Sequence, residues 1–208
     1  ARPKKTHDFL AQHSVPHVLA WCFPKSLDHH VVGFDNQKSG RAIAEHVISY
    51  GHRKLGVIAG LRAGNDRAQD RILGIQDAIS AHPDVQLLDL QECKYSFEEA
   101  GAALDDLLSG AEHPTAIICG SDVLAVGAML RAHDLGLRIP EDISITGFDD
   151  INLARVTTPG LTTVRVPQHE MGRKAAHVLL GLLDADVPQP QSYELMTTII
   201  DRGTLARV

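Results

Sequence analysis

Polar side chains that could bind a small ligand follow several apolar runs of this chain. Asp149 ends the β-type run ISITGFD, and open parallel α/β sheets bind ligands at the carboxyl ends of their strands. A carboxylate can accept hydrogen bonds from two neighbouring hydroxyl groups, which suits a sugar or polyol. The alternative is ordinary turn or helix-capping chemistry, and Asp150 suits that role better than Asp149 does.

Two arginines occupy the segment NDRAQDR, which follows a predicted strand and opens a predicted helix. Arg67 and Arg71 are one helical turn apart and so share a face of that helix. The planar guanidinium group suits carboxylates and vicinal hydroxyls, which makes Arg71 a candidate ligand contact. The alternative is a surface salt bridge to Asp66 or Asp70, which would contribute little to stability.

Three further side chains could complete a polar pocket. Trp21, the only tryptophan, ends a strand-like run, and its apolar body with one N–H group suits either a sugar-stacking wall or the core. Tyr95, just before a capped helix, has the same two interpretations. Ser121 begins the next helix and is a cap or a ligand's hydrogen-bond partner rather than a nucleophile, because it lacks an accompanying base and orienting residue.

Metal and enzyme chemistry find little support in the sequence. The twelve histidines are scattered, and no pair has the spacing and carboxylate company of a zinc site. The chain has no G-x-S-x-G, P-loop or G-x-G-x-x-G motif, each of which would indicate a specific chemistry. We therefore expect no metal, no cofactor and no catalytic residue.

The side chains above need a sheet to position them, and strand-like and helix-like segments alternate along most of the chain. Strands are predicted for HVLAW, HVVGFD, KLGVIAG, VQLLDL, TAIICG, DISITGF and SYELMTTII. Helices are predicted from Asn36 to Gly51, after a cap at Asn65 or Asp66, after a cap at Ser96, from Ser121 to Gly136, and from about Gln168 to Leu183. This alternation predicts a parallel sheet with helices on both faces.

Composition narrows the class of protein. The formal net charge of −6 is unlike that of an isolated nucleic-acid-binding module, which is usually strongly basic. The three cysteines are far apart and form no Cys-x-x-Cys pair, which favours a reducing cytoplasm over a disulfide scaffold. No apolar run approaches the ~20 residues needed to cross a bilayer. We expect a cytoplasmic protein without a membrane segment.

Five segments resemble, in their order, the lactose-repressor (LacI/GalR) family of bacterial transcriptional regulators. They are VPHVLAW; VVGFDNQKSGRAIAEHVISYGHRKLGVIAG; NDRAQDRILGI; GSDVLAVGAML with GLRIPEDISITGFDD; and LTTVRVPQHEMGRKAAHVLL. The likeness runs from about Val15 to the end of the chain. It implies an α/β fold of the periplasmic-binding-protein-like type I, with two doubly wound parallel-sheet subdomains joined by three crossovers.

The resemblance also implies where the subdomains begin and end. Residues 1–51 and 161–189 would form the N-terminal subdomain, and residues 52–160 and 190–208 the C-terminal one. Crossovers near Gly51, near Gly160 and in the PQPQ stretch from Pro188 would form a hinge around a ligand cleft. The family's DNA-binding headpiece and the first two strand–helix units of its N-terminal subdomain have no counterpart here. We therefore expect a domain truncated at its N-terminus, with an incomplete N-terminal subdomain.

The resemblance gives individual residues a role. Asn65, Arg71, Ser121 and Asp149 fall where family members contact effectors. Trp21 falls at another pocket position, and Tyr95 at a third, for which Ser96 is a rival. Val126 and Thr157 fall on surfaces that pair subunits in a two-fold interface.

These observations together predict the effector-sensing and dimerising domain of a LacI-type regulator. It would bind a small polar ligand, a sugar or a sugar acid, between its subdomains. Its partners would be a second copy of itself and, only through a headpiece that this chain lacks, operator DNA. Two other classes stay open: a periplasmic sugar-binding protein of a transporter, and a sugar hydrolase whose turnover would depend on Asp149.

Overall fold

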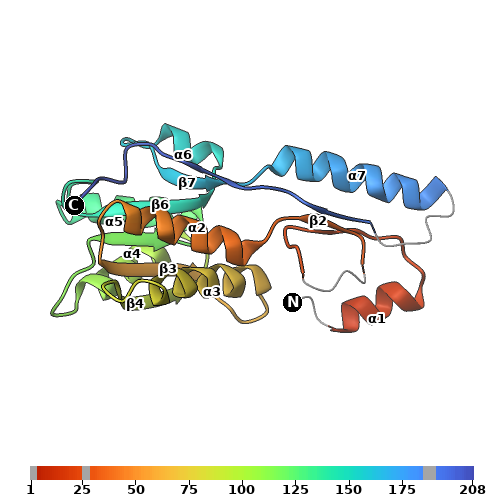
Figure 1. The fold of residues 1–208 in the computed structure, drawn as a ribbon, viewed down its shortest axis with the longest axis horizontal. Helices are drawn as coiled ribbons and strands as arrows, with labels where there is room; N and C mark the ends of the chain where they lie inside the picture. Colours follow the sequence, from red (N-terminus) through yellow and green to blue (C-terminus); the bar gives the residue numbers. More distant parts are fainter. Residues whose placement is uncertain (1–3, 25–28, 185–190) are drawn as a thin grey trace.

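The computed structural model describes residues 4–24, 29–184 and 191–208, and in these ranges the chain forms two α/β parts (Figure 1). The helices are α1 Lys4–Gln12, α2 Asn36–Ser49, α3 Asp66–Ser80, α4 Phe97–Leu108, α5 Asp122–Asp134, α6 Asn152–Val156 and α7 Gln168–Asp184. The strands are β1 Leu19–Ala20, β2 Val31–Gly33, β3 Lys54–Gly60, β4 Gln86–Cys93, β5 Ala116–Cys119, β6 Ser144–Asp149, β7 Thr162–Arg165, β8 Ser192–Glu194 and β9 Thr198–Ile200. The predicted alternation of strands and helices is confirmed.

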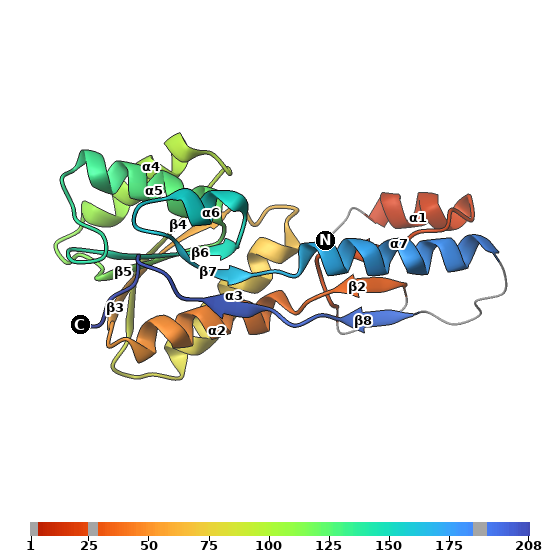
Figure 2. The same cartoon turned by 90° about the horizontal axis from the view of Figure 1, so that it is seen from above.

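The larger part is built on a six-stranded sheet with the order β4-β3-β5-β6-β7-β9, in which only β9 runs antiparallel to its neighbour. Successive side chains of a strand point to opposite faces. Val57 and Ile118 accordingly join the core beneath α2 and α3, while Ile58 and Ile117 join the core beneath α4 and α5. Figure 2 shows the two helical layers on either side of this sheet. Burial on both faces explains why these strands are almost wholly apolar.

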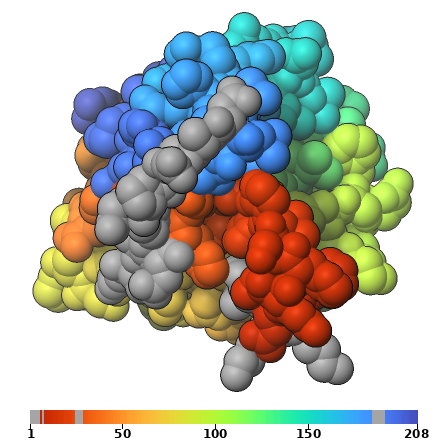
Figure 3. Space-filling view, turned by 90° about the vertical axis from the view of Figure 1, so that its right-hand side faces the viewer, coloured from red at the N-terminus to blue at the C-terminus, as the bar shows by residue number. Residues whose placement is uncertain are grey.

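The smaller part is built on a three-stranded parallel sheet with the order β1-β2-β8. Helix α7 packs on β1 and β2, and α1 lies at the same end of the molecule, which Figure 3 views directly. Val32 and Val178 belong to the same continuous apolar cluster as Phe34 and Ile43. The two parts therefore share one core at the point where they meet.

Three short segments connect the two sheets. They lie between β2 and α2, between β7 and α7, and between β8 and β9. Two side-chain contacts join the first turn of α2 to the end of β8 and the segment after it: the Ser39 and Thr197 hydroxyls are 2.9 Å apart, and Lys38 Nζ lies 3.0 Å from Glu194 Oε1. Each connecting segment is a single short stretch of chain outside helix and strand. Such connections permit a hinge between the two parts.

The strand pairing moves the subdomain boundaries that the resemblance implied. Helix α2 packs on α3, and β7 pairs with β6 and β9, so residues 36–51 and 162–165 belong to the larger part. The segment SYELMTTII forms two strands, β8 in the small sheet and β9 in the large one, instead of a single strand. Apolar patterning identifies a short strand but not the sheet in which it pairs. The crossover predicted from Pro188 lies mostly outside the described residues.

Local sequence signals set the helix ends as predicted. The side chains of Asn65, Ser96 and Ser121 accept hydrogen bonds from the backbone at the starts of α3, α4 and α5. Gly51, with a φ of 100°, follows the end of α2, where a left-handed residue commonly ends a helix.

The described residues contain no helix that is both long and apolar enough to span a membrane. All three cysteines lie in the described ranges and none forms a disulfide. Burial raises the pKa of the Cys93 thiol to about 11 and that of Cys119 well above its usual range. Both thiols are therefore protonated and pack as small apolar side chains.

Candidate functional site

A cavity of about 290 Å³ opens at the carboxyl edge of the large sheet, beside the end of β1. Its lining comes from the ends of β1 and β6, the first turns of α3 and α5, and the loop between β4 and α4. The lining residues are Trp21, Asn65, Arg67, Arg71, Tyr95, Ser121, Val123 and Asp149. The structure thus brings together all six residues predicted for a ligand site, although they lie up to 128 positions apart in the chain. Sequence reasoning omitted Val123 and did not assign Arg67 a contact.

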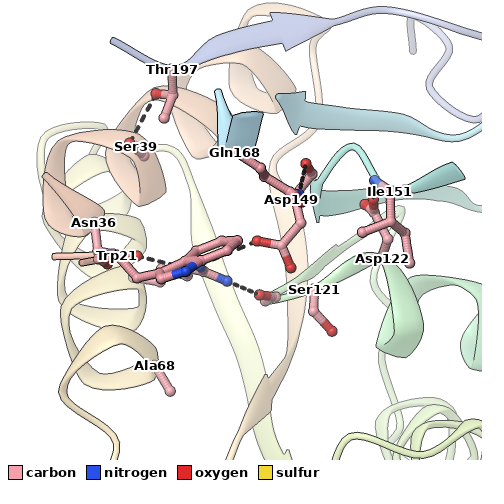
Figure 4. Close-up of polar contacts among 12 residues, drawn as sticks. Trp21, Asn36, Ser39, Ala68, Ser121, Asp122, Asp149, Ile151, Gln168 and Thr197 are labelled. Carbon is pink, nitrogen blue, oxygen red and sulfur yellow. Dashed lines mark hydrogen bonds and ion pairs between the residues drawn. The ribbon is translucent and has the colours of Figure 1, made fainter. Parts of the chain in front are cut away.

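Asp149 stands at the end of β6 with an unusual backbone conformation. Its φ is 112°, a region that non-glycine residues rarely adopt and that occurs mainly where surrounding contacts enforce it. The carbonyl oxygen accepts a hydrogen bond from Gln168 Nε2 at 3.1 Å, a contact drawn in Figure 4. Since Gln168 begins α7, this contact ties the site to the segment that connects the two parts.

Arg71 is held on all sides by buried partners. Its Nε donates to Asn36 Oδ1 at 2.9 Å and its Nη1 donates to the Gly120 carbonyl at 2.7 Å. Its Nη2 lies 3.4 Å from Asp149 Oδ1, and the guanidinium carbon lies 3.7 Å from the centre of the Phe148 ring. These contacts do not use all five N–H donors of the guanidinium group, so some of them remain able to donate to a ligand in the cavity. The predicted alternative, a surface pair with Asp66 or Asp70, does not fit a side chain that is only 8% exposed.

Burial acts on the pKa of both members of this pair. It raises the pKa of Asp149, against the opposing effects of Arg71 and Arg67, and it lowers the pKa of Arg71 despite the charge of Asp149. Each shift reflects the loss of water around a charged group. A ligand that supplies hydrogen bonds to such a desolvated ion pair would offset part of the free-energy cost of its burial.

Asn36 is the functional candidate that sequence reasoning missed. It is buried at the start of α2, and besides accepting from Arg71 it donates from Nδ2 to the Trp21 carbonyl at 2.9 Å. One amide thus joins the wall from the small sheet to the cation of the large one. Figure 4 shows Asn36 beside Trp21. No local pattern marks Asn36, because an asparagine at a helix start is ordinary.

Trp21 supplies the wall of the cavity that belongs to the small part. Its φ of 72° is again in the left-handed region, and its ring meets Phe34 edge to face, with 6.5 Å between the ring centres. The indole packs against the core, as one of the two predicted roles requires, and the residue also lines the cavity, while the sugar-stacking role stays a prediction. A ring held in this way offers a flat apolar surface at little conformational cost.

Asn65 and Tyr95 form the opposite rim. Asn65 accepts from the Ala68 backbone as the cap of α3 and donates from Nδ2 to the Tyr95 hydroxyl at 3.3 Å. A Cβ on Gly60 would stand 2.3 Å from the Tyr95 ring, so this glycine makes room for the ring. Ser96, the rival of Tyr95, caps α4 and is absent from the lining.

Ser121 lies at the floor of the cavity and is almost fully buried. Its oxygen accepts from the Leu124 backbone at 3.3 Å, and its hydroxyl hydrogen stays able to donate. The neighbouring Asp122 is fully buried, accepting from Thr163 Oγ1 at 2.5 Å and from the Ile151 backbone N–H at 2.8 Å. Burial raises the pKa of Asp122 to about 7, outweighing both hydrogen bonds.

Asp150 anchors the loop behind Asp149. Of the two roles predicted for it, turn or helix cap, the cap is wrong, whereas its φ of 53° lies in the left-handed region that turn residues adopt. Helix α6 begins after Ile151 without a side-chain cap. The Asp150 carboxylate instead lies 2.5 Å from Arg202, 2.6 Å from Arg165 and 3.5 Å from Arg155, with a side chain only 1% exposed. Burial would raise its pKa, but the hydrogen bonds from Arg202 and Arg165 prevail and lower it. The two adjacent acids thus differ: Asp150 is buried among three arginines, whereas Asp149 pairs with Arg71 alone and lines the cavity.

Val126 and Thr157 lie together on another surface of the large part. Both line an apolar groove of about 610 Å³ between α5 and the loop after α6. The groove also contains Met129, Leu130, His133, Gly136, Leu137, Arg138, Ile139, Thr158 and Pro159. Leu130 is 55% exposed, and such exposed apolar surfaces commonly mark contacts with another protein.

Comparison with known proteins agrees with this architecture. Residues 44–205 match the family described as a periplasmic binding protein-like domain. The HTH-type transcriptional repressor PurR of Escherichia coli is 32% identical over 176 residues, which cover 83% of this chain and 51% of PurR. The chain therefore spans about half the length of the curated relatives that it matches.

Solved structures of regulators share the fold. A LacI family transcriptional regulator from Silicibacter pomeroyi superimposes with a TM-score of 0.86 at 27% identity, covering 99% of this chain and 75% of its own. The transcriptional regulator CelR in complex with cellobiose gives a TM-score of 0.87 at 26% identity, covering 98% of this chain and 63% of its own. The chain thus belongs to the periplasmic binding protein-like family and is an effector-binding domain of the LacI/GalR type of transcriptional regulator.

Proposed function

We propose that this domain binds a small polar ligand, a sugar or a sugar acid, in the cavity between Trp21 and Asp149. Binding would shift the relative geometry of the two parts and thereby change the operator affinity of a longer protein. The observation that carries the proposal is the two-sided lining: Trp21 comes from the small sheet, and Arg71, Ser121 and Asp149 come from the large one.

The chemistry of the lining supports a polyol. Asp149 would accept hydrogen bonds from ligand hydroxyls, and Arg71 and Ser121 would donate to hydroxyl or ring oxygens. Trp21 or Tyr95 would cover one face of the sugar ring. The volume of about 290 Å³ lies near the lower limit of ~300 Å³ for ligand pockets, which favours a monosaccharide over a larger ligand. CelR, a structural relative, is described in complex with cellobiose.

A ligand can switch the domain only if it binds one hinge geometry more tightly than the other. Trp21 and Arg71 reach the cavity from different parts, and Asn36 joins them at the connecting segment. A ligand that contacts Trp21 on one side and Asp149 on the other would therefore stabilise one separation of these two residues. This differential contact is the physical basis of the proposed switch.

Two partners belong to the same proposal. The apolar groove with Val126 and Thr157 would pair with its counterpart on a second copy, as in a two-fold self-complementary interface. Operator DNA would bind through a separate headpiece, as the name of the HTH-type repressor PurR suggests for that relative. A regulator of this kind would act in the cytoplasm, where its operator is.

A thermal-shift screen with sugars, sugar acids and nucleosides tests the proposal. A ligand that binds the folded state at one hundred times its Kd adds about 2.7 kcal/mol of stability. For any ligand so found, Asp149→Asn and Arg71→Gln should each weaken binding about 10-fold or more, since hydrogen bonds to charged groups contribute ~1.5–3 kcal/mol.

The control for these variants is Asp84→Asn. Asp84 also pairs with an arginine, Arg53, but is 63% exposed and remote from the cavity lining. Binding by calorimetry should be unchanged in this variant. If Asp149→Asn and Arg71→Gln bind the ligand as tightly as wild type and Asp84→Asn, the cavity is not the binding site.

A further inference from the structure

We infer that the ligand of this cavity carries an acid group, a carboxylate or phosphate, and that Arg67 binds it. The inference rests on the proposed function and narrows its ligand class from sugars and sugar acids to compounds that carry an anionic group. Arg67 is an exposed residue of the first turn of α3 and lines the cavity.

The charges of the lining do not balance. Its ionised side chains are those of Arg67, Arg71 and Asp149, two cations against one anion. The Asp149 carboxylate is taken by Arg71, at 3.4 Å. Arg67 is flanked on α3 by Asp66 and Asp70, which have contacts of their own, and its backbone N–H donates to Asp66 Oδ1 at 3.0 Å. The residues that line the cavity therefore carry a net positive charge.

The position of Arg67 suits an anion at the mouth of the cavity. It stands one helical turn before Arg71, so both side chains project from the same face of α3. Arg71 is fixed against Phe148 and Gly120 at depth, whereas Arg67 is free of such constraints. The guanidinium fork matches the oxygens of a carboxylate or phosphate in a bidentate manner. If the hydroxyl groups of the ligand bind Asp149 and Ser121, its acid group would lie at Arg67.

Electrostatics of the surroundings add to this preference. The first turns of α3 and α5 both contribute to the lining, through Asn65 and Ser121, and helix N-termini carry partial positive charge. Arg67 also lowers the pKa of the nearby Asp149, against the dominant effect of burial. The two acids behind the site are bound elsewhere: Asp122 accepts from Thr163 and Ile151, and Asp150 pairs with three arginines. They offer Arg67 no replacement for an anionic ligand.

Matched pairs of ligands test the inference by calorimetry on the wild-type protein. The pairs are gluconate with glucitol, glucuronate with glucose, galacturonate with galactose, and glucose 6-phosphate with glucose. We expect the acid of at least one pair to bind 10-fold or more tightly than its neutral partner, and its affinity to fall with added salt, which screens charge. The carboxylate and phosphate arms distinguish the two sources of the anion.

Arg67→Gln should remove this discrimination. It should weaken binding of the acid about 10-fold or more, while the neutral partner binds as it does to wild type. Arg62→Gln is the control, because Arg62 precedes the same helix but is paired with Glu92 and does not line the cavity. It should bind the acid as wild type does.

The outcomes separate this inference from the proposed function. Neutral sugars that bind as tightly as their acids, with an affinity that depends on Asp149, would overturn the anionic ligand and leave the cavity function standing. Acids that bind Arg67→Gln as tightly as wild type would overturn the role of Arg67. A panel in which no compound binds would contradict both.

Discussion

Residues that are far apart in the chain meet at the cavity through one buried amide. Asn36 accepts from Arg71 and donates to the Trp21 carbonyl, and it is only 2% exposed. These contacts use both ends of the Asn36 side chain. They hold the cation of the large part and the aromatic wall of the small part in one geometry.

We expect Asn36→Ala to lower the free energy of unfolding by about 1–3 kcal/mol, because it leaves a buried charged donor without its acceptor. The same substitution should weaken ligand binding, because Arg71 loses a contact that positions it. Urea unfolding measures the first effect. Asn152→Ala, at an exposed position of α6, should change stability by no more than about 0.5 kcal/mol. Equal unfolding midpoints for Asn36→Ala and wild type would refute this role of Asn36.

Elements of the large part meet at Asp122, which connects three of them. Its carboxylate stands in the first turn of α5 and accepts from Thr163 of β7 and from Ile151 at the start of α6. A Cβ on Gly147 of β6 would lie 2.4 Å from its Oδ1. Asp122 therefore holds the loop that carries Asp149 in place. Burial disfavours the charged form of this acid.

Stability should depend on pH through Asp122. Burial raises its pKa in the folded state to about 7, against ~3.9 for an unfolded chain. Its contribution is fully present below the unfolded value and is lost as pH rises through 7, at most by about 1.4 kcal/mol per pH unit. Wild type should therefore lose stability relative to Asp122→Asn between pH 5 and 8.

Urea unfolding of both proteins across this range measures the difference. His52, whose pKa burial lowers, titrates with the opposite sign, but it is present in both proteins and cancels. A stability difference that stays constant from pH 5 to 8 would show that Asp122 does not titrate as described.

Elements could be predicted from the sequence where their signals are local. The caps Asn65, Ser96 and Ser121 and the stop at Gly51 depend on residues a few positions away, and the structure has them all. Sheet membership depends on distant partners, so neither the division of SYELMTTII between two sheets nor the pairing of β7 could be inferred. The roles of Asn36 and Asp150 were missed for the same reason, because their partners lie on other elements.

The whole molecule places its cavity where two sheets meet. Six residues predicted from motif and resemblance gather there, and Asp149 is bound through its carbonyl to Gln168 at the start of α7. A change in the connecting segment would thus act on the backbone of Asp149, and a change at Asp149 would act on the segment. This reciprocity is what an effector switch requires.

A crystal structure of the protein with a compound from the ligand screen tests the central claim most directly. We expect the ligand to lie between Trp21 and Asp149, with hydroxyl groups within hydrogen-bond distance of the Asp149 carboxylate and of Arg71. A ligand bound elsewhere on the protein, with this cavity unoccupied, would contradict it.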